Sequence, residues 1–247
     1  SQPISPSPAP DWWRPGPGLT WQWQIGNNDI DTSFVADVYD IDLYVDPPII
    51  DELHAQGRRV ICYIRVGSWE EWRPDAALFP QEVLGKEYEG WPGERWLDIR
   101  RIDELAPILR ARLDLCALRG FDGVEPDNIE IHTNNTGFRL TYEDQLGYAR
   151  WLAAEAHSRG LAIGIKNAPD MVADSLPFFD FAVTEDAFYY GWIEEMLPFI
   201  HDGKPVFAAV YTDMDVDFDA ACAYGREHNV RFILKNRGLD AWLQTCP

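Results

Sequence analysis

Eight short apolar runs, separated by longer amphipathic segments, recur along the chain from Trp21 onward. A strand followed by a helix, repeated in this way, is typical of βα units that build a parallel sheet. The predicted strands are 21–25, 39–45, 60–66, 120–125, 161–166, 179–184, 205–211 and 230–234. Eight units in a chain of 247 residues match the size of a (β/α)8 TIM barrel. The sequence therefore predicts an α/β fold of this type in a single domain.

Several sequence motifs that would indicate other chemistry are missing from the chain. No G-x-G-x-x-G or G-x-x-x-x-G-K-[ST] sequence occurs, which disfavours an open nucleotide-binding sheet. No H-E-x-x-H zinc motif and no G-x-S-x-G nucleophile elbow occurs either. We expect a site that uses neither a metal nor a cofactor.

The segment between the third and fourth predicted strands is far longer than an ordinary βα loop. It contains Trp69, Trp72, Trp91 and Trp96. Long loops on barrels usually carry function, and aromatic faces commonly bind sugars. The alternative is that these tryptophans form a small core that closes their own loop.

Residues 1–18 are rich in Pro and Ser and have no periodicity. Such a composition suits a linker or the end of a processed precursor, so the predicted barrel domain is 19–247. No apolar run reaches the roughly 18 residues that a membrane helix needs, and the amino terminus lacks the pattern of a signal peptide. No membrane contact is expected.

Acidic residues outnumber basic ones by 41 to 21, for a formal net charge of −20. This charge makes nucleic acid or an anionic membrane surface an unfavourable partner and favours a cationic ligand. The alternative interpretation is that the acidic charge only keeps a secreted protein soluble.

The four cysteines divide into two kinds by their surroundings. Cys62 lies in an apolar strand and Cys116 on the apolar face of a predicted helix, so both resemble small buried hydrophobic residues. Cys222 and Cys246 flank the last helix and strand. A disulfide between these two would fix the carboxyl terminus and indicate an oxidising compartment.

Polar residues follow the predicted strands at their carboxyl ends, where barrel enzymes build their sites. They are Gln24, Asp40, Asp42, Arg65, Ser68, Glu125, Asp127, Lys166, Asn167, Glu185, Asp186, Tyr211, Asp213, Lys235 and Asn236. In the segment 121–128, Pro126 cannot donate to a sheet ladder, so Glu125 and Asp127 should lie where a strand ends. The alternative is that Asp127 or Asn128 only caps a helix.

Asp127 and Glu185 are the natural catalytic pair among these residues. They follow the fourth and sixth strands, and two carboxyl groups about 5 to 9 Å apart across a barrel mouth suit glycoside hydrolysis. Lys166, on the strand between them, would hold a carboxylate ionised or a sugar hydroxyl in place. Its alternative role is a structural salt bridge within the barrel.

The chain also resembles glycoside hydrolase family 114, the endo-α-1,4-polygalactosaminidases, over nearly its whole length from Trp21 to Cys246. The matching stretches are 21–25, 38–43, 60–63, 67–68, 72–75, 90–94, 96–100, 122–128, 134–137, 164–167 and 234–236. The resemblance implies a (β/α)8 barrel. It also implies a secreted enzyme that cleaves an α-1,4-linked, galactosamine-containing exopolysaccharide internally.

The resemblance implies residue roles as well. Asp127 matches the nucleophile and Glu185 the acid/base, and similar barrels act with retention of the anomeric configuration. The residues expected to bind substrate are Asp42, Tyr63, Arg65, Trp72, Asp98, Glu125, Lys166 and Tyr211. The charge of Arg65 at the pocket floor would repel the ammonium group of galactosamine.

Two other functions remain open on the sequence alone. The first is a barrel that binds polysaccharide without cleaving it, since one fold serves many functions. The second is an α-glycosidase of different sugar specificity. In each case the expected partner is a polysaccharide, cationic where galactosamine is deacetylated, and the protein is expected to be a monomer.

Overall fold

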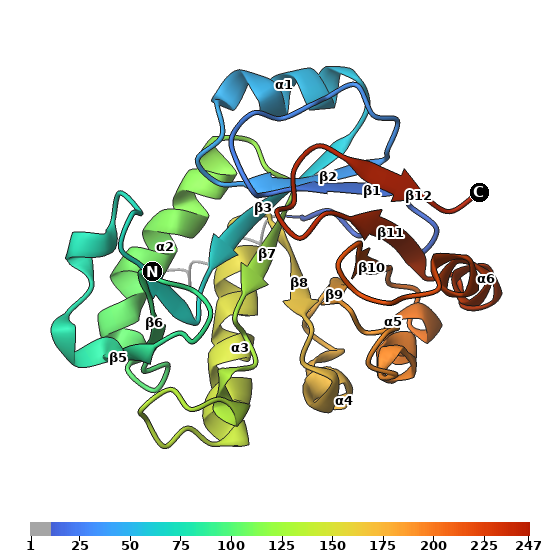
Figure 1. Cartoon of the computed structure of the whole chain (residues 1–247). Helices are drawn as coiled ribbons and strands as arrows, with labels where there is room; N and C mark the ends of the chain where they lie inside the picture. Colours follow the sequence, from blue (N-terminus) through green and yellow to red (C-terminus); the bar gives the residue numbers. More distant parts are fainter. Residues whose placement is uncertain (1–10) are drawn as a thin grey trace, which may run out of the picture.

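The computed structural model describes residues 11–247, which form one nearly closed barrel (Figure 1). In their order across the main sheet, its strands are β1 (Trp21–Gln24), β2 (Val38–Asp42), β3 (Arg59–Arg65), β7 (Gly123–Asp127), β8 (Ala162–Lys166), β9 (Phe181–Glu185), β10 (Val206–Tyr211), β11 (Arg231–Lys235) and β12 (Leu243–Thr245). Neighbours from β1 to β11 are parallel, and β12 is antiparallel to β11. The eight predicted strands and the barrel are confirmed, although several strand ends differ by a few residues.

The two ends of the sheet are joined by side chains and loops. The indole Nε1 of Trp21 donates to the carbonyl of Arg231 at 3.0 Å, and Nε2 of Gln22 donates to the carbonyl of Ala241 at 2.9 Å. The backbone N–H of Gly26 donates to Leu239 at 3.1 Å. These bonds hold β1 next to the carboxyl-terminal segment and nearly complete the ring.

Helices surround the strands on the outside of the barrel (Figure 1). They are α1 (Pro47–Ala55), α2 (Ile102–Leu118), α3 (Tyr142–His157), α4 (Val172–Ser175), α5 (Leu197–His201) and α6 (Phe218–His228), with short 3₁₀ helices at Ala76–Leu78, Gln81–Val83, Ile131–Thr133, Pro169–Met171 and Ile193–Met196. No helix in the described part of the chain is long and apolar enough to cross a membrane.

Two apolar clusters hold the barrel together. The inner one, between the strands, includes Trp21, Trp23, Phe181 and Phe207, and the outer one lies between strands and helices. Gly164 is required by the inner packing, because a Cβ there would lie 2.3 Å from the ring of Phe181. Burial of these large rings, together with the outer cluster, stabilises the barrel.

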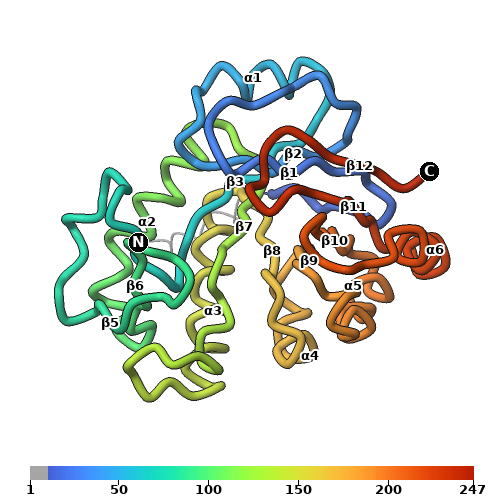
Figure 2. The backbone as a smooth tube through the Cα atoms, in the orientation of Figure 1, coloured from blue at the N-terminus to red at the C-terminus, as the bar shows by residue number. Residues whose placement is uncertain are grey.

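The long segment after β3 folds into a small antiparallel sheet beside the barrel (Figure 2). Its strands are β4 (Ser68–Glu70), β5 (Leu84–Glu87) and β6 (Glu94–Leu97), in the order β4-β6-β5. Trp96 is buried and Trp69 half-buried, whereas Trp72 and Trp91 are 55% and 48% exposed. The tryptophans therefore divide between a local core and an open surface.

Part of the predicted linker lies against the barrel. Trp12 stacks on His157 at 3.9 Å between ring centroids, and its Nε1 donates to Asp180 at 3.0 Å. Trp13 lies 6.4 Å from Phe181 of the inner cluster. Residues 1–10 lie outside the described residues.

Two disulfides are present in the described chain. Cys222 pairs with Cys246, as predicted. Cys62 pairs with Cys116, so the interpretation of these two as free hydrophobic residues is wrong. Both side chains are buried at the contact of β3 with α2, and this packing brings them together.

Candidate active site

Strand β7 brings two carboxylates and its neighbour β3 brings a tyrosine and an arginine to the same end of the barrel. The register pairs Tyr63 with Glu125 and Arg65 with Asp127. Alternate residues on a strand share a face, so both carboxylates point inward. Pro126 is tolerated because the pairing of β7 with β8 has already ended at Val124.

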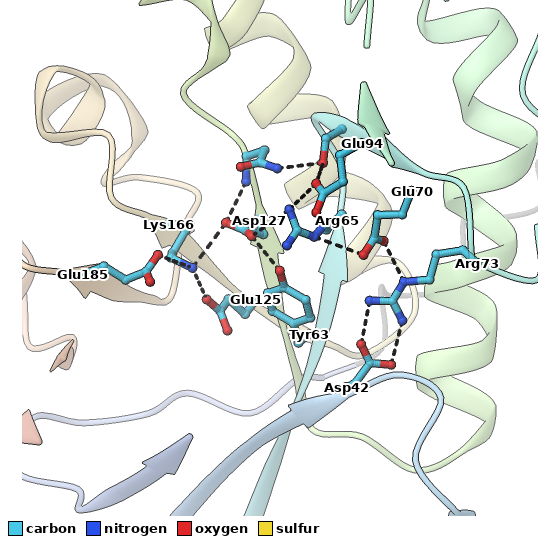
Figure 3. A network of polar contacts seen from close by, with 12 residues as sticks. Asp42, Tyr63, Arg65, Glu70, Arg73, Glu94, Glu125, Asp127, Lys166 and Glu185 are labelled. Atoms are coloured by element: carbon cyan, nitrogen blue, oxygen red, sulfur yellow. Dashed lines mark hydrogen bonds and ion pairs between the residues drawn. The ribbon is translucent and has the colours of Figure 1, made fainter. Parts of the chain in front are cut away.

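Lys166, at the end of β8, is the centre of the site (Figure 3). Its Nζ lies 2.7 Å from Oε1 of Glu125, 3.2 Å from Oδ1 of Asp127 and 3.2 Å from Oε2 of Glu185. The Lys166 side chain is only 2% exposed. Its pKa is raised well above the ordinary value, because the charges of Asp127, Glu125 and Glu185 outweigh the opposing effect of burial. The lysine is therefore a fixed buried cation.

Asp127 is held as an anion by its hydrogen-bond partners. The hydroxyl of Tyr63 donates to Oδ2 at 2.6 Å, and the backbone N–H of Asn128 donates to Oδ1 at 3.0 Å. Burial raises the pKa of Asp127, but Lys166, Arg65 and the Tyr63 bond outweigh it and hold this pKa to about 2. Asp127 is thus ionised at neutral pH, as a nucleophile must be.

Glu185, at the end of β9, is the most exposed of the three carboxylates that contact Lys166. Its side chain is 31% exposed, against 15% for Asp127 and 1% for Glu125. Tyr211 donates a hydrogen bond to Oε1, and the guanidinium of Arg237 stacks over the Tyr211 ring at 3.8 Å. One oxygen of Glu185 is thus fixed by a phenol while the carboxyl group still faces solvent.

The two predicted catalytic carboxylates lie close together. Oδ1 of Asp127 and Oε2 of Glu185 are each 3.2 Å from the same Nζ, so these oxygens cannot be further apart than twice that distance. Retaining glycosidases place their carboxyl groups about 5 to 5.5 Å apart, and inverting ones about 6.5 to 9.5 Å. The shared lysine therefore holds the two carboxyl groups close enough to flank one glycosidic bond.

Glu125 and Asp40 form a buried layer beneath these groups. Nε1 of Trp23 donates to Oε2 of Glu125 at 3.0 Å, and burial raises the pKa of Glu125. Burial, followed by the charge of Glu125, raises the pKa of Asp40 well above its ordinary value. No described donor reaches either oxygen of Asp40, and a hydrogen bond with Glu125 adds to the raised pKa, which suits a neutral Asp40 carboxyl group that donates its proton to Glu125.

The charge of Arg65 is offset by acidic residues from the small sheet. Its Nη1 lies 2.6 Å from Glu94 and 3.9 Å from Asp127, and its Nε lies 3.2 Å from Glu70. Arg65 therefore contributes no unpaired positive charge to the pocket, contrary to the expectation that it would repel an ammonium group. Sequence reasoning missed Glu70 and Glu94, although Glu94 lies in a stretch that matches the family.

Two other predicted substrate-binding residues line a separate part of the mouth. Asp42 forms an ion pair with Arg73 at 2.7 Å, and Arg73 also contacts Glu70 at 2.6 Å. Asp42 and the exposed ring of Trp72 border a cavity of about 300 Å³. This side of the mouth is therefore open, but the Asp42 carboxylate is already paired with Arg73.

Asp98, like Asp42 and Trp72, is a predicted site residue that makes no ion pair or hydrogen bond with Lys166 among the described residues. Its carboxylate accepts bonds of 2.7 and 2.8 Å from Arg100, a partner two residues away. The other predicted residues, Tyr63, Arg65, Glu125, Asp127, Lys166, Glu185 and Tyr211, form one contact network. In the part of the chain that is described, no three His, Cys, Asp or Glu side chains are grouped to hold a metal ion.

A buried lysine with carboxylates from the two neighbouring strands β7 and β9 lies at the carboxyl end of the barrel, where the resemblance predicts the site of a glycoside hydrolase. The family model described as "Glycoside-hydrolase family GH114" matches residues 3–247 of the chain. The chain belongs to glycoside hydrolase family GH114. The resemblance found in the sequence is confirmed, and the protein is a glycoside hydrolase.

GH114 membership agrees with comparison to solved structures. The crystal structure of Aspergillus fumigatus Ega3 in complex with galactosamine is 36% identical and superposes with a TM-score of 0.90, covering 96% of this chain and 98% of that one. The glycoside hydrolase domain of PelA from Pseudomonas aeruginosa, 15% identical with a TM-score of 0.70, covers 93% of this chain and 99% of its own and shares the fold. An uncharacterised Deinococcus radiodurans protein is 26% identical over 260 residues, which cover 94% of this chain and 83% of that protein.

Proposed function

We propose that this chain is a secreted, endo-acting glycoside hydrolase that cleaves α-1,4-linked, galactosamine-containing exopolysaccharide of the galactosaminogalactan type with retention. The observation that carries the proposal is the pairing of Asp127 and Glu185 with the same buried Lys166. The likeness to Ega3, which was crystallised with galactosamine, supports the choice of sugar.

In the first step, the ionised Asp127 attacks the anomeric carbon and Glu185 gives its proton to the leaving oxygen. A glycosyl ester forms on Asp127, the glycosidic bond breaks, and the leaving chain departs with the proton.

In the second step, the proton moves in the reverse direction. Lys166 remains in contact with Glu125 and Glu185 while Asp127 is esterified. Glu185, which gave up its proton in the first step, accepts one from the attacking water. Water breaks the ester and restores both catalytic groups.

The charge of the site supports a cationic substrate. Both cations of the site are paired and leave no free positive charge to repel an ammonium group, because Lys166 lies among Asp127, Glu125 and Glu185, and Arg65 lies between Glu70 and Glu94. The net charge of −20 would attract a polycation over a long range, with an effect that salt weakens. Two disulfides support secretion, since such bonds persist in oxidising compartments.

The proposal is tested by measuring new reducing ends from partly deacetylated galactosaminogalactan. Asp127→Asn and Glu185→Gln, made separately, should each lower the rate by about 10³-fold or more. Asp114→Asn is the control, because it changes a mostly exposed carboxylate on α2. Wild-type rates in either catalytic variant would contradict the assignment.

The same assay separates the alternatives. Binding of the polymer by wild-type protein without new reducing ends would indicate a non-catalytic polysaccharide-binding barrel. Cleavage of simple α-galactosides in preference to α-galactosaminides would indicate a different sugar specificity.

A further inference from the structure

The strands that carry the catalytic cluster, β7, β8 and β9, each end at a turn whose first residue has a left-handed backbone without being a glycine. These residues are Asn128, Asn167 and Asp186, with φ of 63°, 52° and 52°. Non-glycine residues seldom adopt this conformation, and where they do, the surrounding contacts hold it and a functional site is often near. After β8 the conformation continues into the buried Ala168, at φ 55°, so this turn needs the strongest support.

The side chain of Asn167 takes the place of a backbone group in the pairing of β8 with β9. The register pairs Lys166 with Val183, and the N–H of Asn167 still donates to the carbonyl of Val183 at 2.8 Å. If β8 continued in this register, the N–H of Glu185 would donate to the backbone carbonyl of residue 167. The chain turns away at that point, and Oδ1 of Asn167 accepts the bond from the Glu185 N–H at 2.9 Å.

Glu130, from the loop after β7, holds the other side of this turn. Its Oε2 accepts a hydrogen bond from the N–H of Ala168. Burial raises the pKa of Glu130 to about 7, although hydrogen bonds from the Ala168 N–H and from the Asn167 side chain oppose the shift. The Asn167 amide therefore has a partner at each end, the backbone of Glu185 and the carboxyl group of Glu130. The mechanism above uses neither Asn167 nor Glu130.

We propose that Asn167 is a positioning residue, which fixes the backbone of Glu185 relative to Lys166 so that the acid/base is aligned with the leaving oxygen. The inference rests on the proposed function. Asn167 is joined covalently to Lys166 and hydrogen-bonded to Glu185, whose Oε2 lies 3.2 Å from the lysine Nζ. General acid catalysis depends on such alignment, and small displacements of the acid lower the rate. Asn suits this position because it tolerates a left-handed backbone and still supplies an acceptor, which glycine lacks.

The test compares two substrates of the full-length protein. One is partly deacetylated galactosaminogalactan, whose leaving oxygen needs a proton, and the other is the α-fluoride of a galactosamine trisaccharide, whose leaving group needs none. Asn167→Gly keeps the left-handed backbone and removes only the acceptor, so kcat/KM should fall about tenfold for the polymer and change less than about twofold for the fluoride. Asn229→Gly is the matched control and should change neither, because Asn229 is an exposed asparagine with φ 59° at the end of α6.

An unchanged kcat/KM for the polymer in Asn167→Gly would overturn the proposal. An equal fall for both substrates would overturn it too, because it would show a general disturbance of the pocket in place of a misaligned acid. Amide hydrogen exchange at Glu185 adds a measurement that needs no activity, and the exchange should be about tenfold faster in Asn167→Gly than in wild type. A wild-type protein that cleaves neither substrate would refute the proposed function, whereas unchanged exchange at Glu185 would show that Asn167 does not hold this backbone.

Discussion

The hydroxyl of Tyr63 donates a 2.6 Å hydrogen bond to Oδ2 of Asp127, from the neighbouring strand. The bond occupies the carboxylate oxygen that does not face Lys166. Together the two contacts orient the carboxylate and hold its negative charge.

Tyr63→Phe should lower kcat about 10- to 100-fold, because a hydrogen bond to a charged group contributes about 1.5–3 kcal/mol. Loss of the donor should also raise the pKa of Asp127 above its present value of about 2. The acidic limb of the profile of kcat/KM against pH should therefore move to higher pH. An unchanged profile with unchanged kcat would show that Tyr63 does not support the nucleophile.

Lys166→Met should abolish activity and lower the free energy of unfolding by about 3–5 kcal/mol, because it leaves buried carboxylates without their cation. The difference in the free energy of unfolding between wild type and variant should be smallest at acid pH, where those carboxylates become protonated. Urea unfolding of both proteins at several pH values measures this difference in the free energy of unfolding.

Lys235→Met is the matched control for Lys166→Met. Lys235 is also buried, but its Nζ contacts Gln22 and the carbonyl of Asp240 in place of carboxylates. Burial lowers the pKa of Lys235 to about 8. Because Nζ bonds only to an amide and a carbonyl oxygen among the described residues, replacing Lys235 breaks no hydrogen bond to a carboxylate. We expect Lys235→Met to lower the free energy of unfolding by less than half as much as Lys166→Met. Equal decreases in the two variants would show that the carboxylates do not depend on Lys166.

Glu94 should make stability depend on pH. Burial raises its pKa from an ordinary value of 4.5 to about 7, despite the nearby Arg65. The folded protein therefore binds a proton that the unfolded chain has released, and the free energy of unfolding should fall as pH rises from about 4.5 to 7.

Glu94→Gln should remove this component, which amounts to at most about 3 kcal/mol. The measurement is thermal or urea unfolding of both proteins across that range, with Glu82→Gln as a control that should retain the wild-type slope. A Glu94→Gln slope identical to that of wild type would contradict the assignment.

The two disulfides should differ in their contribution to stability. Cys62 and Cys116 close a loop with a sequence separation of 54, whereas Cys222 and Cys246 close one of 24. Removing either pair by double substitution with Ala should cost about 2–5 kcal/mol, and loop entropy alone makes the longer one worth about 0.7 kcal/mol more. Thermal unfolding of the two variants compares the stability lost with each disulfide. A larger loss of stability for the variant with Cys222→Ala and Cys246→Ala would contradict the predicted order.

The barrel and the central carboxylates could be predicted because both follow from periodicity. Apolar runs define the strands, and parallel neighbours place their carboxyl ends together, so Asp127, Lys166 and Glu185 had to lie near one another. The Cys62–Cys116 bond could not be predicted in this way. Burial explains each cysteine separately, and only the packing of α2 on β3 shows that they meet.

The acidic partners of Arg65 could not be predicted from the sequence either. Glu70 and Glu94 come from β4 and β6, in a segment whose short strands have no clear alternation of polar and apolar residues. Asp98 lies just beyond β6, yet its carboxylate pairs locally with Arg100. Such pairings depend on side-chain directions in an irregular segment, which residue spacing does not determine.

In the proposed mechanism, Asp127 attacks the sugar while Glu185 acts as acid and base. The most direct measurement is mass spectrometry of Glu185→Gln after reaction with an α-galactosaminyl fluoride, whose leaving group needs no acid. We predict a glycosyl adduct that accumulates for lack of a base and that fragmentation assigns to Asp127. An adduct on Glu125 or another carboxylate, or direct release of the inverted product without an adduct, would contradict the account.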